Sequence, residues 1–126
     1  MTNDPPPARF DFPKTRRLIL SSDFLRVKTD GEAQRGSLMI LGVLQTHEDE
    51  PRPFRAGFVT SKRIGGAVVR NRVRRRLREI VRQHQHTLRP GIWLVVIARP
   101  PAARAGYRQL EDEWLRLAKR AFILAP

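Results

Sequence analysis

The sequence of 126 residues contains no cysteine. Its absence excludes disulfide bonds, thiolate metal sites and cysteine nucleophiles together, and is compatible with a reducing cytosol. Stability must therefore come from a buried core, and a chain of this length is enough for one domain with a modest core.

Long apolar runs are also missing. No stretch approaches the ~18 apolar residues that span a bilayer, and residues 1–7 have no basic region followed by an apolar run. The basic segment described below offers mainly Val, Leu and Ile, and it lacks the Trp and Phe of a helix that lies on a membrane surface. We therefore expect a cytoplasmic protein with no membrane partner.

Side chains that commonly catalyse reactions are few. His84 and His86 are two residues apart and point to different sides of a helix, and His47 stands alone in an expected loop, so a zinc site is not predicted. The acids at 48–50 fall in the same loop and those at 111–113 at a helix end, where solvation explains them better than paired acid–base catalysis. The chain offers no constellation for catalysis by its own side chains, and we expect no small-molecule cofactor.

A nucleotide-binding loop is absent too. Gly65 and Gly66 precede a basic segment, but the glycine-rich spacings that end in Lys-Ser/Thr are missing. A helix N-terminus offers free N–H donors, so two interpretations stay open: the glycines bind a backbone phosphate, or they only make the turn.

Acids are scarce relative to bases. Lys and Arg number 25 against 12 Asp and Glu, which gives a formal net charge of +13 and an isoelectric point near 11.7. Such a field attracts polyanions at a distance and makes their binding depend strongly on salt.

The arginines concentrate in residues 61–88, where apolar residues recur at steps of three and four, the spacing of a helix. At ~100° per residue they fall in an arc of roughly 120°, the width of a core-facing stripe. The stripe consists of Val69, Val73, Leu77, Ile80, Val81, His84 and Leu88.

Arginine covers the opposite side of this helix. Glu79 is the only acid from Lys62 to Arg82, whereas a merely solvated charged face interleaves acids and bases. Guanidinium groups stay charged and offer a planar fork of donors that matches phosphate oxygens. The pattern therefore favours a polyanion site over a solvated surface.

Residues 1–13 are rich in proline and predict an irregular arm, and residues 14–126 predict a single domain. Within it, the cap signal at 21–23 predicts a short helix over 24–28. Phe24 on this helix is most simply a core residue; if exposed, it would be a stacking platform for a nucleobase.

Three segments predict strands. Residues 36–45 form an apolar run, and residues 54–61 alternate and are expected to pair with it as a hairpin. Residues 92–98 are apolar throughout, so we expect a strand buried on both faces. It follows the central helix, which should end near residues 90–91, and is therefore expected to lie parallel to the strand at 54–61.

A last helix is predicted over 107–122. Its apolar stripe consists of Tyr107, Leu110, Trp114, Leu117, Ala118, Ala121 and Phe122. The order is a helix, two or three strands, a helix, a strand and a helix, which indicates an α+β two-layer sandwich and, with three strands counted, the order α-β-β-β-α-β-α.

Residues 61–79 resemble the signature of the bacterial ribonuclease P protein subunit, roughly Lys-x-x-Gly-x-Ala-Val-x-Arg-Asn-x-x-Lys/Arg-Arg-x-x-Arg-Glu. Its fixed positions are filled here by Lys62, Gly65, Ala67, Val68, Arg70, Asn71, Arg74, Arg75, Arg78 and Glu79. The flanks at 17–24, 56–59 and 97–100 also match, so the resemblance covers about residues 14–122.

The resemblance implies a subunit of ribonuclease P, an endoribonuclease whose RNA is the catalyst, holds Mg²⁺ and cleaves precursor tRNA to make the mature 5′ end. The implied partners are this catalytic RNA and precursor tRNA. The family fold also implies a left-handed strand-helix-strand crossover, whereas general rules predict a right-handed one.

The resemblance also implies two sets of site residues. Those expected to bind the catalytic RNA are Lys62, Arg63, Arg70, Asn71, Arg72, Arg74, Arg75 and Arg78. Those expected to line a cleft for the single-stranded 5′ leader, between the sheet and the first helix, are Arg17, Phe24, Lys28 and Phe58. The family often has aromatic residues where this chain has Lys28 and, in the first long strand, only aliphatics and Gly42. Contacts to the leader's phosphates would then carry more of the binding than base stacking.

Two other functions compete with this one. Charge and size alone also suit a structural ribosomal RNA-binding protein, which would sediment with ribosomal subunits. An independent nuclease would need an acid or histidine cluster that the sequence does not offer.

Overall fold

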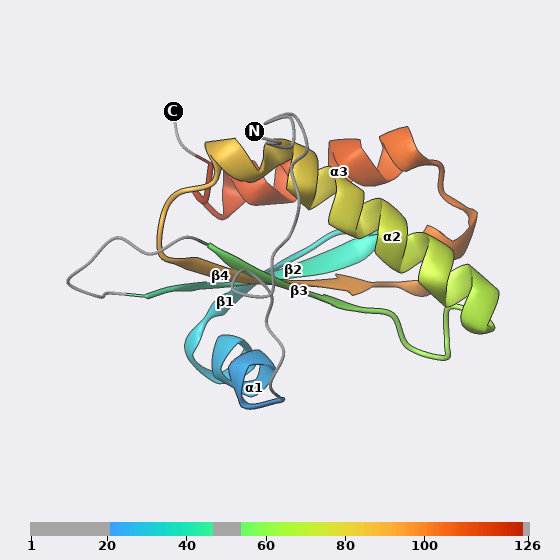
Figure 1. The fold of residues 1–126 in the computed structure, drawn as a ribbon, viewed down its shortest axis with the longest axis horizontal. Helices are drawn as coiled ribbons and strands as arrows, with labels where there is room; N and C mark the ends of the chain where they lie inside the picture. Colours follow the sequence, from blue (N-terminus) through green and yellow to red (C-terminus); the bar gives the residue numbers. More distant parts are fainter. Residues whose placement is uncertain (1–20, 47–53, 125–126) are drawn as a thin grey trace, which may run out of the picture.

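The structure, a computed structural model, describes residues 21–46 and 54–124, so the predicted arm at 1–13 and Arg17 lie outside the described residues. The described elements follow the predicted order α-β-β-β-α-β-α (Figure 1). They are α1 (Ser21–Asp30), β1 (Glu32–Arg35), β2 (Met39–Gln45), β3 (Arg55–Val59), α2 (Ala67–His84), the 3-10 turn η2 (Gln85–Thr87), β4 (Ile92–Ala98), the 3-10 turn η3 (Pro100–Arg104) and α3 (Tyr107–Arg120).

The strands form one sheet in the order β1-β2-β4-β3. As predicted, β4 is parallel to β3, but it is also antiparallel to β2 and lies between the two. The prediction that residues 36–45 and 54–61 form a hairpin is therefore wrong. The reason lies in β4, of whose seven residues five are buried: a strand that is apolar on both sides takes an inner place, with a neighbour at each edge and a layer on each face.

The partner of β2 at the outer edge is β1, in the register Glu32↔Val43 to Arg35↔Ile40. Three of its four residues are polar, and three are exposed. Neither alternation nor an apolar run marks this segment in the sequence, because only backbone pairing to β2 makes it a strand.

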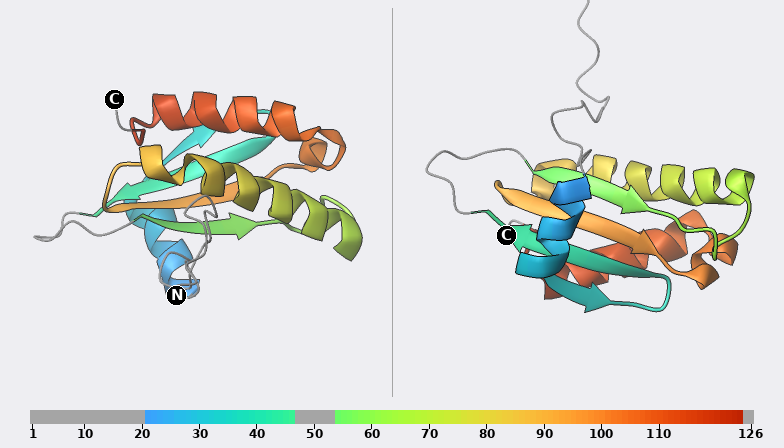
Figure 2. Two further views of the ribbon diagram at one scale, coloured as in Figure 1. Left: turned by 45° about the horizontal axis from the view of Figure 1, so that its top comes forward. Right: turned by 90° about the horizontal axis from the view of Figure 1, so that it is seen from below.

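The units β3, α2 and β4 form the left-handed crossover that the family resemblance implies. In the right-hand view of Figure 2, β3 and β4 run in the same direction while α2 returns behind the sheet. The crossover places α2 on the same face as α3, and of the described helices only α1 lies on the opposite face (Figure 1). A right-handed connection between these strands would have put α2 on the α1 face.

The main core fills the space between the sheet and the helix pair α2 and α3. Four predicted stripe residues of each helix are buried: Val73, Leu77, Ile80 and Val81 on α2, and Leu110, Trp114, Leu117 and Ala118 on α3. The prediction fails at Phe122, which is 79% exposed. Helix α3 ends at Arg120, and Phe122 takes a φ of 58°, a left-handed conformation. This turn directs Ile123 into the core instead.

A buried carboxylate joins α3 to the turn between β1 and β2. Glu113 accepts hydrogen bonds from Ser37 N (3.1 Å), Ser37 Oγ (2.9 Å), Leu38 N (2.8 Å) and Met39 N (2.9 Å). A Cβ on Gly36 would lie 2.5 Å from Glu113 Oε2, so only glycine fits there. The solvated role expected for the acids at 111–113 is thus wrong for Glu113, which is 2% exposed.

A smaller apolar cluster lies under α1 on the other face of the sheet. It consists of Val27, Leu44 and Val95, with Phe24, Val59 and Trp93 packed around them. Phe24 is half-buried here, so it both contributes to a small core and remains accessible.

Candidate RNA interface

A tight turn leads from β3 into α2. Backbone hydrogen bonds run from Ile64 N to Ser61 O (3.1 Å) and from Gly65 N to Lys62 O (3.2 Å), and the buried Ile64 anchors the turn. Gly65 has a φ of 151°, and a Cβ there would lie 3.2 Å from Val69 Cβ, so the position requires glycine. The turn leaves Lys62 and Arg63 exposed beside the first turn of α2.

Arg74 is held in place before any partner binds. Its Nη2 donates to Thr60 Oγ1 (2.6 Å) at the end of β3, and its Nη1 donates to Asn71 Oδ1 (3.1 Å) one turn earlier on α2. A guanidinium has five N–H donors, so the others remain for an external acceptor. Asn71, also predicted as an RNA contact, therefore lies beside Arg74 and orients it.

The cations around Arg74 are not neutralised by the part of the chain that the structure describes. Arg75 is exposed and Arg70 half-buried, and no described carboxylate forms an ion pair with Arg70, Arg74 or Arg75. Arg78, half-buried, lies one turn after Arg74. The N-terminal half of α2 and the turn before it thus present a concentrated positive surface, which we call the α2 basic surface (Lys62, Arg63, Arg70, Asn71, Arg74, Arg75 and Arg78).

Arg72 points to the other side of α2. Its Nη2 donates to Ala103 O (2.9 Å), and one turn later Arg76 Nη1 donates to Ala105 O (3.0 Å). Both arginines join α2 to the segment that begins α3. Arg72 therefore has a structural contact that its place in the motif does not reveal, and the structure does not group it with the α2 basic surface.

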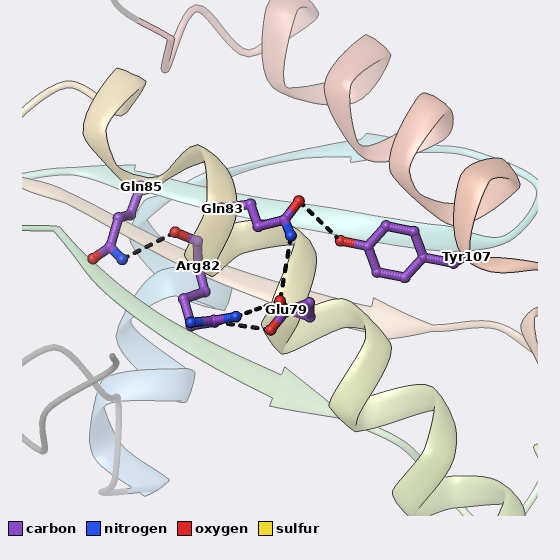
Figure 3. Close-up of polar contacts among 5 residues, drawn as sticks. All are labelled: Glu79, Arg82, Gln83, Gln85 and Tyr107. Atoms are coloured by element: carbon purple, nitrogen blue, oxygen red, sulfur yellow. Dashed lines mark hydrogen bonds and ion pairs between the residues drawn. The ribbon is translucent and has the colours of Figure 1, made fainter. Parts of the chain in front are cut away.

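Glu79, the only acid between Lys62 and Arg82, also has a structural role (Figure 3). Glu79 accepts a hydrogen bond from Arg82 Nε (2.8 Å) and a shorter one from Arg82 Nη2, and Gln83 Nε2 donates to the same carboxylate (3.3 Å). The hydrogen bond from Arg82 lowers the pKa of Glu79, against the opposing effect of burial. Tyr107 Oη donates to Gln83 Oε1 (3.4 Å), and burial, with the charges of nearby carboxylates, raises the pKa of Tyr107. Glu79 thus forms an ion pair with Arg82, at the C-terminal part of α2.

A groove of about 490 Å³ lies between α1 and the exposed face of the sheet. Phe24 and Lys28 on α1 line it, as expected for a cleft between helix and sheet. Its strand residues are mainly aliphatic or glycine: Ile40, Gly42, Val59, Val95 and Ile97. Apart from Phe24, none of the lining residues within 21–46 and 54–124 is aromatic.

Phe58 does not line this groove. It packs against the main core on the opposite face of the sheet, and its neighbour Val59 takes the place in the groove. The assignment of Phe58 to the cleft is therefore wrong. The alternation within 54–61 carries the signal for this, because Phe58 shares its face with the buried Ala56 and Val59 with Arg55.

The described residues show neither a cluster of metal ligands nor a membrane-spanning helix. They contain no group of three or more His, Asp or Glu that could hold a metal ion. None of their helices combines the length and the apolar character that crossing a membrane requires.

Similarity to known proteins covers most of the chain. The family model described as Ribonuclease P matches residues 12–122. The ribonuclease P protein component of Roseiflexus castenholzii is 39% identical over 109 residues, covering 86% of this chain and 87% of that protein. The corresponding protein of Acidothermus cellulolyticus is 41% identical over 108 residues, covering 86% and 89%.

Solved structures of similar fold come from the same family. The RNase P protein of Staphylococcus aureus superposes with a TM-score of 0.79 at 26% identity, covering 88% of this chain and 99% of that one. The RNase P protein of Thermotoga maritima gives a TM-score of 0.71 at 27% identity, covering 82% and 96%.

Proposed function

The chain belongs to the ribonuclease P protein family, the protein component of a tRNA-processing endoribonuclease, and from this premise we propose that its α2 basic surface binds the catalytic RNA of that enzyme. We further propose that the groove beside α1 binds the single-stranded 5′ leader of precursor tRNA. Family membership decides against the ribosomal and independent-nuclease alternatives.

The observation that carries the first part is the preset orientation of Arg74, to which no described carboxylate is paired. Thr60 and Asn71 hold the guanidinium of Arg74 in one orientation, so less side-chain entropy is lost when a phosphate binds. Because no described carboxylate pairs with Arg70, Arg74 or Arg75, a phosphate replaces water and counterions rather than a competing ion pair.

The groove supports the second part through its shape and its charge. It has a volume of about 490 Å³, and Lys28 and Arg35 supply cations along its lining, against Glu32. Among the described lining residues, only Phe24 offers a ring for stacking. Leader binding therefore rests on phosphate contacts and apolar packing more than on stacked bases.

In the proposed function, the RNA catalyses the cleavage. Mg²⁺ is held mainly by phosphate oxygens of the catalytic RNA and substrate, the hard oxygen ligands that this ion prefers. The protein positions the substrate and lowers the electrostatic cost of bringing two polyanions together. We place this activity in the cytoplasm, with catalytic RNA and precursor tRNA as the partners.

Reconstitution with the cognate RNA tests the proposal. The chain should lower the Mg²⁺ concentration at which the RNA cleaves precursor tRNA, and the chain alone should not cleave. If the chain leaves the Mg²⁺ requirement of the RNA unchanged, the proposal is wrong.

A charge-matched pair of variants tests the α2 basic surface itself. Changing Arg70, Arg74 and Arg75 to Gln should reduce the salt dependence of RNA binding, the slope of log K against log salt, by about 2 to 3. The control changes three exposed cations of α3 to Gln: Arg108, Lys119 and Arg120. This variant should retain most of the salt slope. Equal effects of the two variants would show that net charge, not this surface, governs binding.

A further inference from the structure

A second cationic site lies on the α1 face of the sheet, at the start of β4. There the guanidinium carbon of Arg26 lies 5.1 Å from the centroid of the Trp93 ring, and that of Arg55 lies 5.5 Å from it. The three residues come from α1, β3 and β4, and Arg55 is the direct partner of Trp93 in the parallel pairing. The fold alone brings them together.

Apolar side chains of the small cluster under α1 hold the indole of Trp93 in place. It packs against the small cluster of Val27, Leu44 and Val95 and is half-buried. A ring held in this way is a rigid platform, and an arginine that rests on it keeps its charge while losing much of its freedom to move. One ring thereby holds two long side chains.

Neither guanidinium has a polar partner within the described part of the chain. Arg26 and Arg55 make no hydrogen bond and no ion pair there, and the ring is their only specific contact. Each guanidinium has five N–H donors, and none of them is used by the described residues. Two like charges held at one ring, with no carboxylate of residues 21–46 and 54–124 paired to either, repel each other, so an anion that contacts both relieves this repulsion.

We propose that Arg26 and Arg55, seated on Trp93, form a clamp for the phosphodiester backbone of RNA, separate from the groove and from the α2 basic surface. The proposal rests on the function proposed above, and it names a third contact of the same protein with RNA. Trp93 is a positioning residue here, because both of the groups that meet the phosphates are guanidiniums.

The location sets which RNA can reach the clamp. Trp93 is two residues from Val95, which lines the groove, a separation of about 7 Å along β4. It is at the start of β4, beside the start of β3, whereas the α2 basic surface begins beyond the end of β3. An RNA strand that leaves the groove past α1 can reach the clamp, and so can a separate part of the catalytic RNA.

The test uses the reconstituted holoenzyme and two charge-matched double variants. Changing Arg26 and Arg55 to Gln should lower the salt slope of RNA binding by about 1.4, from about 0.7 for each lost single-strand contact. The control, Lys119→Gln with Arg120→Gln, removes the same charge from an exposed end of α3 and should change the slope much less. Thermal unfolding of both variants checks that α1 remains docked.

A second pair of variants separates positioning from charge. Trp93→Leu removes the platform but keeps both arginines, and it should lower the slope by part of the same amount. Trp93→Phe keeps a ring and should remain close to the wild type. If Trp93→Leu unfolds the chain, the salt slopes of Trp93→Phe and of the arginine variant still test the clamp.

Two binding arms identify the source of the phosphates. A slope change with the catalytic RNA alone assigns the clamp to that RNA, and a change only with precursor tRNA whose leader extends past the groove assigns it to the leader. An arginine variant that matches its α3 control in both arms overturns the clamp. That result leaves the proposed function intact, provided the wild type still lowers the Mg²⁺ requirement; if the wild type does not, the proposed function itself has failed.

Discussion

Replacing Glu113 with Gln should destabilise the fold, although the side chain keeps its size. Four donors converge on the carboxylate, two on each oxygen: Ser37 N and Oγ on Oε1, and Leu38 N and Met39 N on Oε2. An amide nitrogen cannot accept, so whichever way the Gln amide is turned, two of these donors face another donor.

The magnitude follows from the burial of this site. Glu113 is 2% exposed, so water does not readily replace the lost acceptor. A buried donor left without a partner costs about 1–3 kcal/mol, and Ser37 Oγ can rotate to another acceptor. We therefore expect Glu113→Gln to lower the free energy of unfolding by about 2–4 kcal/mol, a large part of the roughly 5–15 kcal/mol that a domain has in total.

Urea unfolding followed by far-UV circular dichroism measures this loss. The control is Asp112→Asn, which removes the same charge from the exposed neighbouring position and should stay within about 0.5 kcal/mol of the wild type. If Glu113→Gln also stays within that margin, the four hydrogen bonds do not hold α3 to the β1–β2 turn, and the argument is refuted.

Three further predictions concern charge, the groove and the sheet faces. The pKa of Glu79 is lowered from 4.5, so its carboxylate stabilises the fold above that pH and loses the contribution as pH falls below it. In thermal unfolding, Glu79→Gln should therefore be less stable than the wild type at about pH 7 and approach it at about pH 3; a constant gap would contradict this. Lys28→Phe should add about 1–3 kcal/mol of base stacking to leader binding and reduce its salt slope by about 0.7, and an unchanged slope would place Lys28 away from the leader. Phe58→Ala should cost roughly 3 kcal/mol of stability in urea unfolding with little change in leader affinity, whereas Phe24→Ala should weaken leader binding; the reverse result would contradict their assigned faces.

Local sequence pattern was enough for the features that depend on neighbours along the chain. The three- and four-residue spacing of Val73, Leu77 and Ile80 places them in the core, because a helix determines which side chains share a face. The same pattern places the arginines outside, and the glycine turn at Gly65 follows from what one backbone conformation allows. The apolar run at 92–98 likewise predicts a buried strand, since no other position hides both of its faces.

Tertiary structure alone decided which distant segments meet. The insertion of β4 between β2 and β3, and the left-handed path of α2, depend on the total burial of all layers together, which no local window contains. For the same reason Arg72 contacts a carbonyl at Ala103 instead of joining Arg74, and Glu113 lies beneath a turn 76 residues away. The ring of Trp93 meets two arginines because α1, β3 and β4 converge there. A sequence specifies the faces of its helices and strands through short-range geometry, whereas contacts between those faces arise only when the whole core closes.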